Sequence, residues 1–247
     1  MRDLKQYEHN YQQKSFEDWQ VMFRRKKVLS LMNRYPHNRI LEIGCGMEPL
    51  VLYMPENAFD SYTIVEPSDS FFQHSQEATK GNRAIRCFHM PFAALPEMIS
   101  AQFDFIICSS LLHELEKPEQ MLQEIRKICT PETVVHINVP NANSFHRLLA
   151  REMKIITDTH CLTDRNLLFQ QHTVFDENTL SELILENGFE IIESGSFFIK
   201  PFTHAQMYAM LTQGIMDETV LEGLYQLGER WNAFGSEIFV NIKLLQI

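Results

Sequence analysis

Short apolar runs and segments of helical spacing alternate along the first 140 residues of the chain. The apolar runs have the length of strands, and apolar residues recur at helical intervals between them. They predict five strands, at residues 39–43, 61–66, 84–89, 103–109 and 133–139. Strands that alternate with helices are typical of a parallel sheet covered by helices on both faces. We therefore predict an α/β fold of the doubly wound type.

The ends of the predicted helices carry residues that suit a helix end. Helical apolar spacing over 16–34 stops before Pro36. Ser68 can cap the next helix, which we expect to stop before Gly81. Pro118 favours the start of a further helix, because proline fits the first helical turn.

The pattern changes after Pro140. Residues 141–176 are rich in polar residues and contain one helical piece, at 144–153, without a clear strand. Asp176 then caps a predicted helix. We predict a sixth strand within 189–199, helices at 204–212 and 217–227, and a seventh strand within 236–245. We expect one domain, divided into an N-terminal helical segment (1–35), a sheet core (36–140), an insertion (141–176) and a C-terminal part of the sheet (177–247).

The end of the first predicted strand carries the most informative polar pattern. Residues 40–46 read Ile-Leu-Glu-Ile-Gly-Cys-Gly, so that Glu42 precedes Gly44 and Gly46. Glycines let the chain turn tightly and approach a ligand. Glu66 ends the second strand 22 residues after Gly44, a spacing at which an acid can bond a ribose hydroxyl. These residues predict a nucleoside-containing cofactor across the ends of two neighbouring strands; the alternative is an ordinary tight strand–helix turn.

The charge beside the glycines favours a cationic cofactor. A dinucleotide places its pyrophosphate at a helix N-terminus. Glu48 stands where that anion would lie, and Glu42 adds a second negative group nearby. A nicotinamide-dependent reductase is therefore disfavoured.

An acid-x-Gly-x-Gly pattern followed by a strand-end acid resembles class I S-adenosylmethionine (SAM) methyltransferases, whose sulfonium cofactor is positive and leaves as S-adenosylhomocysteine (SAH). The resemblance implies seven strands with the last one antiparallel, and an N-terminal helical lid that closes over the cofactor. The family often has a third glycine where this chain has Glu48. The resemblance implies cofactor contacts from Glu42, Gly44, Cys45, Gly46, Glu66, Pro67 and Tyr11, and from Arg24 or Arg25.

Residues 103–114 resemble the fourth-strand motif of small-molecule methyltransferases. Ligands of parallel sheets bind at the carboxyl ends of strands, so we expect Cys108, Ser109 and Ser110 to face the cofactor. His113 follows, near where a methyl acceptor would lie. Its neutral imidazole is a candidate general base, and the alternative is a structural histidine at a helix cap.

The exit of the third strand departs from the family pattern. This chain has Pro91 at the position where relatives have an acid that contacts the adenine. We expect Phe92, or the backbone near it, to contact the adenine.

Later segments resemble a methyltransferase subgroup that is common in bacterial polysaccharide and secondary-metabolite pathways. Polar side chains after the fifth strand supply donors and acceptors on the acceptor side. His172 is a second candidate base or a capping residue near Asp176, and Lys200 faces the substrate or is a surface charge. The expected substrate-binding residues are Asn141, Asn143, His146, Arg147 and Lys200.

Composition limits the partners. The 247 residues carry a net charge of −10, which disfavours nucleic acid because such binding needs phosphate neutralisation. The basic run 24–27 is the one positively charged cluster in this otherwise acidic sequence. The five cysteines form no Cys-x-x-Cys pair, so we expect buried thiols in a reducing cytoplasm and neither disulfides nor a metal site. Residues 1–5 lack an apolar signal core, and no apolar run approaches the length of a membrane span.

Together these patterns predict a cytoplasmic SAM-dependent methyltransferase. We expect transfer to an oxygen of a small polar metabolite, such as a sugar, a phosphate or a phosphoramidate. N-methylation of a small amine or peptide is the alternative reaction, and a degenerate module that only binds SAM or SAH is the alternative class. An anionic acceptor needs Arg147 or Lys200 exposed in its pocket, whereas an amine needs acids.

Overall fold

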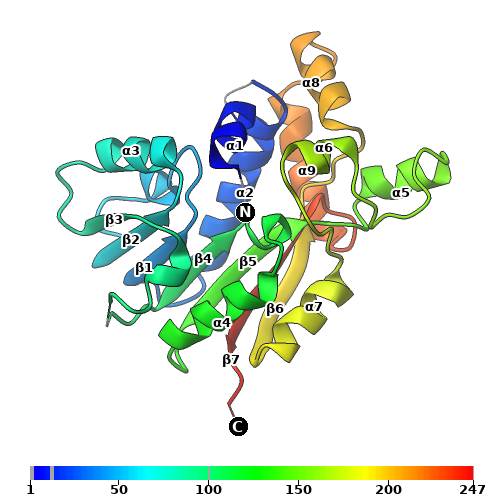
Figure 1. The fold of residues 1–247 in the computed structure, drawn as a ribbon. Coiled ribbons are helices and arrows are strands. Elements are labelled where there is room, and N and C mark those ends of the chain that lie inside the picture. Colours follow the sequence, from blue (N-terminus) through cyan, green and yellow to red (C-terminus); the bar gives the residue numbers. More distant parts are fainter. Residues whose placement is uncertain (1–2, 12–13, 100, 247) are drawn as a thin grey trace.

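The computed structural model describes residues 3–11, 14–99 and 101–246, without the side chains of residues 7 and 9–11. Seven strands form one sheet in the order β3-β2-β1-β4-β5-β7-β6 (Figure 1). They are β1 (Arg39–Ile43), β2 (Ser61–Glu66), β3 (Ile85–His89), β4 (Phe105–Ser109), β5 (Val134–Pro140), β6 (Phe189–Phe197) and β7 (Glu237–Leu244). Strand β7 runs antiparallel to β5 and β6, and the other pairs are parallel. The predicted fold class is confirmed.

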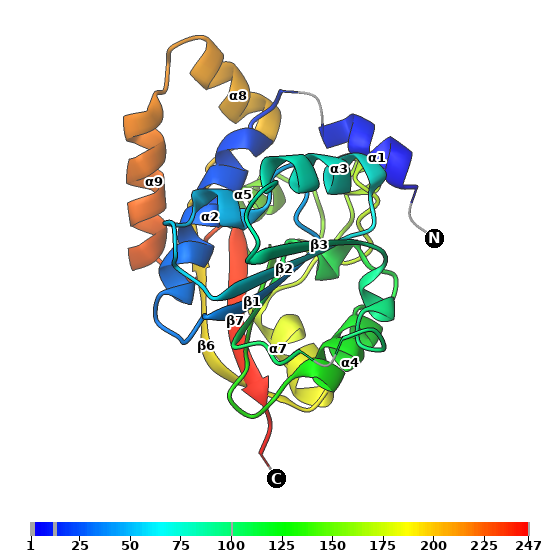
Figure 2. The same cartoon turned by 90° about the vertical axis from the view of Figure 1, so that its left-hand side faces the viewer.

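Helices cover both faces of the sheet. Figure 2 shows α2 and α9 on one face and α4 and α7 on the other. The helices are α1 (Leu4–Tyr11), α2 (Glu17–Met32), α3 (Asp69–Ala78), α4 (Pro118–Ile128), α5 (Phe145–Glu152), α6 (Asp164–Leu168), α7 (Glu177–Glu186), α8 (His204–Thr212) and α9 (Glu218–Arg230). Three 3-10 turns are η1 (Leu50–Tyr53), η2 (Phe92–Ala94) and η3 (Leu112–Glu114). The sequence pattern missed these turns and α6.

Two predicted helix caps are confirmed. The Ser68 hydroxyl accepts a hydrogen bond from the Phe71 amide at 3.2 Å, and the Asp176 carboxylate accepts one from the Thr179 amide at 2.8 Å. Each side chain satisfies an amide that the helix itself leaves without a partner. The local chemistry therefore fixes where α3 and α7 begin.

Apolar side chains fill both sides of the sheet. One cluster joins the sheet to α4 and α7 and includes Ile106, Leu122 and Ile184. On the other face, a second cluster packs the later part of α2 on the strands. A third, rich in phenylalanine, joins α2, α8 and α9 to the ends of β6 and β7. No helix in the described part of the chain is long and apolar enough to cross a bilayer.

The strand order reverses between β1 and β4, because β2 lies on one side of β1 and β4 on the other. In open α/β sheets, ligands bind at the carboxyl edge beside such a switch point. The start of β7 lies at the same edge, since Glu237 pairs with Pro140 at the end of β5. Helices α1, α6 and α8 lie over this edge (Figure 1).

Candidate active site

The chain leaves β1 through two glycines in left-handed backbone conformations. Gly44 has φ +71° and Gly46 has φ +63°, and a Cβ placed on Gly46 would meet no atom within 4 Å. The Gly44 amide donates to the Val65 carbonyl of β2 at 2.9 Å. A turn and the short η1 follow. The result is an open backbone cradle at the switch point of the sheet.

Glu66 closes one side of this cradle. Its buried carboxylate accepts hydrogen bonds from the Ser68 amide at 2.8 Å and from the Gly46 amide at 3.3 Å. The Cys45 thiol lies 3.1 Å from the Ser75 hydroxyl, and burial raises its pKa. Pro67 is half-buried between Glu66 and Ser68. The carboxylate is thus fixed at the end of β2, beside the glycine turn.

Glu42 lies beneath the turn and is bound by the protein itself. It accepts hydrogen bonds from the Tyr62 hydroxyl at 2.7 Å and from the Leu50 amide at 3.1 Å. Burial raises the pKa of Glu42 to about 7. Its carboxyl group therefore braces η1 and is only partly charged near neutrality, a weaker negative group than the sequence indicated.

Arg25 balances the charge of Glu48. The two side chains form an ion pair of 3.0 Å, and the Arg25 guanidinium stacks 4.5 Å from the centre of the Tyr53 ring. The sequence argument that Glu48 repels a pyrophosphate is weakened by this pairing. Arg24 points elsewhere, toward Glu237. Of the two arginines, Arg25 lies beside the glycine turn, and the Tyr11 side chain lies outside the described residues.

The end of β4 presents two serines at the same edge. Ser109 pairs with Asn138 of β5, and the Ser110 amide donates to the Asn138 carbonyl at 2.9 Å. Ser110 has φ +54°, an unusual conformation for a residue other than glycine. The Cys108 side chain is fully buried in the core, and burial raises its pKa to about 12. Phe92 is buried in the same core cluster, so little of either side chain is open to a ligand.

The two predicted base histidines come from neighbouring segments. The backbone carbonyl of His113, in η3, accepts hydrogen bonds from the His172 amide at 2.9 Å and from the Thr173 amide at 3.2 Å. The His113 ring is buried, with Nε2 3.9 Å from a carboxylate oxygen of Glu114, whereas the His172 side chain is exposed. Segment 172–173 is therefore held against the end of β4.

The predicted substrate-binding residues separate into two places. Asn141 donates to the carbonyls of Ala233 and Gly235, and the Arg147 guanidinium binds the carbonyls of Thr159 and Cys161. Both side chains thus hold loops of the protein. Asn143 contacts Asp176 at 3.4 Å. With Asn141 it lines a cavity of about 280 Å³ that also includes Glu177.

A second, apolar cavity of about 520 Å³ adjoins this one. It lies between α5 and the loop 231–234 and is lined by Phe145, Leu148, Leu149, Glu152, Trp231, Asn232, Ala233 and Phe234. Neither cavity includes a residue of the glycine turn, Lys200 or His146. These two cavities and the expected site of chemistry are therefore separate.

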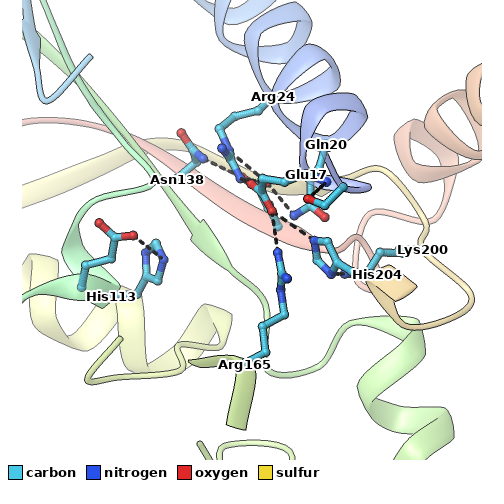
Figure 3. A network of polar contacts seen from close by, with 11 residues as sticks. Glu17, Gln20, Arg24, His113, Asn138, Arg165, Lys200 and His204 are labelled. Atoms are coloured by element: carbon cyan, nitrogen blue, oxygen red, sulfur yellow. Dashed lines mark hydrogen bonds and ion pairs between the residues drawn. The ribbon is translucent and has the colours of Figure 1, made fainter. Parts of the chain in front are cut away.

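Through its contact with His204, Lys200 belongs instead to a buried polar network, part of which Figure 3 shows. The charges of Lys200 and His204 act on His146. Glu237 accepts hydrogen bonds from Arg24, Gln20 and Asn138. Nearby, Glu17 accepts from Arg165 at 3.2 Å and contacts His204 at 3.1 Å. The sequence reasoning missed Glu17, Arg165, His204 and Glu237, because they are far apart in the chain and form no local motif.

A family profile described as a methyltransferase domain matches residues 7–194 of this chain. The chain belongs to the methyltransferase domain family. The predicted family resemblance is thereby confirmed, and the expectation of a methyltransferase that uses SAM is confirmed at the level of the family.

Curated relatives contain a similar domain within much longer chains. Hybrid PKS-NRPS synthetase phm1 of Pyrenochaetopsis sp is 30% identical over 114 residues, which are 43% of this chain and 3% of the relative. Fumosorinone synthetase of Cordyceps fumosorosea is 28% identical over 129 residues, 47% of this chain and 3% of the relative. The chain thus spans about 3% of the length of these relatives.

Solved structures share the fold at low identity. A SAM-dependent methyltransferase from Mesorhizobium loti has a TM-score of 0.59 at 13% identity, over 87% of this chain and 95% of that one. The plantazolicin methyltransferase BamL, solved with a desmethyl analogue and SAH, has a TM-score of 0.60 at 13% identity, over 94% of this chain and 88% of that one. These similarities show the methyltransferase fold.

Proposed function

We propose that this chain transfers a methyl group from SAM to an oxygen of a small polar acceptor. The observation that carries the proposal is the open cradle of Gly44 and Gly46 beside the fixed carboxylate of Glu66. Two backbone amides donate to Glu66, and the Cys45 thiol lies 3.7 Å from it, so the carboxylate is fixed at the strand end where an acid can bond a ribose hydroxyl. The cradle therefore fits a nucleoside.

We assign the other cofactor contacts from the position of each residue at the carboxyl edge of the sheet. Gly44, Cys45, Gly46, Glu66 and Pro67 would hold the nucleoside. Ser109, Ser110 and Arg25 would contact the amino-acid part of SAM, and the buried Cys108 and Phe92 would contribute mainly through their backbone and shape. SAM, when bound, supplies an activated methyl group on a positive sulfur.

The acceptor side has two tasks, alignment and proton removal. Holding an oxygen in line with the methyl group by itself lowers the barrier, because reactants are already oriented. His113 and His172 remain our candidates for the group that takes the hydroxyl proton. The hydrogen bonds from residues 172 and 173 to the His113 carbonyl support a shared role at the end of β4.

The family subgroup favours a sugar, a phosphate or a phosphoramidate of polysaccharide or secondary metabolism as the acceptor. An amine acceptor would need a carboxylate without a cationic partner. Glu17 and Glu237, the acids of the buried network, pair with Arg165 and Arg24. Glu177, in contrast, lines the 280 Å³ cavity and forms no ion pair among the described residues, so an amine acceptor stays the alternative.

Calorimetry and isotope transfer test the proposal. We expect SAM and SAH to bind with micromolar-range affinity and NAD not to bind, and labelled SAM to methylate a member of a panel of hydroxyl acceptors. Tighter binding of NAD would refute the assignment. Binding of SAH without transfer to any acceptor would support the degenerate binding module.

A further inference from the structure

Lys200 is a buried lysine whose charge has no carboxylate partner. Lys200 follows the end of β6 in the chain, and the residue is 3% exposed. Its hydrogen-bond partner within the described residues is Nδ1 of His204, 3.0 Å from Nζ. Burying an ammonium without an opposite charge costs several kcal/mol, so a position like this is rarely kept for stability alone.

His204 and Glu17 determine which group donates the hydrogen bond between Lys200 and His204. Nε2 of His204 lies 3.1 Å from Glu17. Burial acts to raise the pKa of Glu17, but the His204 hydrogen bond and the charge of Arg24 hold it well below its usual range. Glu17 is therefore ionised and accepts from Nε2–H, which leaves Nδ1 to accept from Lys200. The lysine donates one of its three protons and keeps two for another acceptor.

The charges around Lys200 do not cancel it. Arg24 balances Glu237, and Arg165 balances Glu17. Among the described residues, Lys200 and Arg147 form no ion pair with a carboxylate. Arg147 is bound by the carbonyls of Thr159 and Cys161, whereas Lys200 contacts the neutral His204. The titratable or charged groups that face it are Glu17 of α2, Glu237 of β7, Arg165 of α6, Arg147 and His146 of α5, and His204 of α8. Burial lowers the pKa of Lys200 to about 7.

His146 brings a second polar group to the same place from α5. Its Nδ1 atom is buried and has no hydrogen-bond partner among the described residues. Burial and the charge of Lys200 lower its pKa well below the usual value. The elements that meet here (α2, α5, α6, α8 and the end of β6) all lie at or beside the carboxyl edge, where the acceptor is expected.

We propose that Lys200 and His146 bind an oxyanion, a carboxylate or a phosphate, on the methyl acceptor. The proposal rests on the proposed methyl transfer and names its substrate class: a hydroxyl compound with one negatively charged group. The oxyanion supplies the missing counter-charge to the ammonium and accepts its remaining protons. Arg165, whose side chain is 39% exposed, adds a partly exposed cation beside this network.

Binding of the anion is coupled to protonation of the lysine. At pH 8 much of Lys200 is neutral, and a bound anion favours the ammonium form. We therefore expect proton uptake on binding at pH 8. The affinity should fall as the pH rises above 7, because each bound anion then requires a proton from solution.

Calorimetry of the SAH complex with inorganic phosphate and with 4-hydroxybenzoate tests the proposal. We expect one of the two probes to bind, which identifies the oxyanion, and Lys200→Met to weaken it by about 10- to 100-fold. Lys80→Met, at an exposed lysine that pairs with Glu77, is the control and should bind as wild type. Equal affinity in wild type and K200M, or no binding of either probe to wild type, would overturn the proposal.

A second variant keeps the test valid if K200M fails to fold. Lys200→Arg stays charged at all accessible pH values, so its affinity for the probe should no longer fall above pH 7. A wild-type protein whose affinity is flat between pH 6 and 9 would also overturn the proposal. Phosphate or carboxylate binding without SAH binding would instead refute the proposed function while leaving the oxyanion site intact.

Discussion

Arg24 in α2 donates hydrogen bonds to both carboxylate oxygens of Glu237 at the start of β7, at 2.7 to 3.0 Å. The same carboxylate accepts from Asn138 of β5 at 2.7 Å and from Gln20 of α2 at 3.0 Å. Glu237 is fully buried. The Glu237 side chain therefore joins α2 to β5 and β7 at the edge of the sheet where we expect the cofactor.

Arg24→Met should strongly destabilise the protein, because it leaves the buried Glu237 without its cation. We expect a loss of about 3 to 5 kcal/mol in the free energy of unfolding, measured by urea denaturation. The double variant R24M/E237Q should recover part of this loss, since it removes both charges. The exposed control Lys80→Ala should change stability by less than about 0.5 kcal/mol. Wild-type stability of R24M would contradict the assignment.

Gly46→Ala should weaken SAH binding more than it weakens the fold. Gly214, between α8 and α9, offers a matched control: its φ is +69° against +63° at Gly46, and a Cβ at either glycine meets no atom within 4 Å. Each substitution should cost about 1 to 2 kcal/mol of stability through backbone strain. By calorimetry, G46A alone should lower the affinity for SAH. Equal affinities of G46A and G214A would place the cofactor elsewhere.

Glu66→Gln should weaken SAM binding by about 1.5 to 3 kcal/mol, the range for hydrogen bonds to a charged group. The Ser68 and Gly46 amides both donate to Glu66, so the carboxylate also supports the local fold. Glu66→Ala should therefore also lower the melting temperature. A large loss of stability in E66Q with unchanged SAM affinity would make Glu66 purely structural.

The strands and the glycine turn could be predicted because their signals are local. Apolar runs bounded by turn residues defined all seven strands, and the spacing from Gly44 to Glu66 placed both at one edge. The caps at Ser68 and Asp176 depend on contacts only three residues away. Contacts between residues this close in sequence can be predicted from a single segment of the chain.

The buried network could not be predicted, because its contacts join distant segments. Glu17 contacts Arg165 and His204, 148 and 187 residues away in sequence. The same limit explains why the sequence did not show the contacts of Asn141 and Arg147 with the backbone. Their residue types suit binding, and only the folded chain shows that backbone carbonyls occupy them.

Glu42→Gln should stabilise the protein at pH 8 relative to wild type. The pKa of Glu42 is raised from an ordinary 4.5 to about 7, so the folded state binds a proton that the unfolded state releases. This contribution is fully present below pH 4.5 and is lost as the pH rises to 7. We expect the difference in unfolding free energy between E42Q and wild type to grow by about 2 to 3 kcal/mol over that range. A difference independent of pH would show that Glu42 titrates normally.

His113 and His172 should differ in their effect on methyl transfer, because only a group within hydrogen-bond reach of the nucleophile can act as its base. We favour His113, which follows the end of β4 directly. Replacing the base by Asn should lower the transfer rate by about 100- to 10,000-fold with SAM affinity intact, and should abolish the lower limb of the pH–rate profile. Replacing the other histidine should mainly raise the Michaelis constant of the acceptor. If both variants keep wild-type turnover at saturating acceptor, neither histidine is the base, and transfer depends on alignment of the acceptor alone.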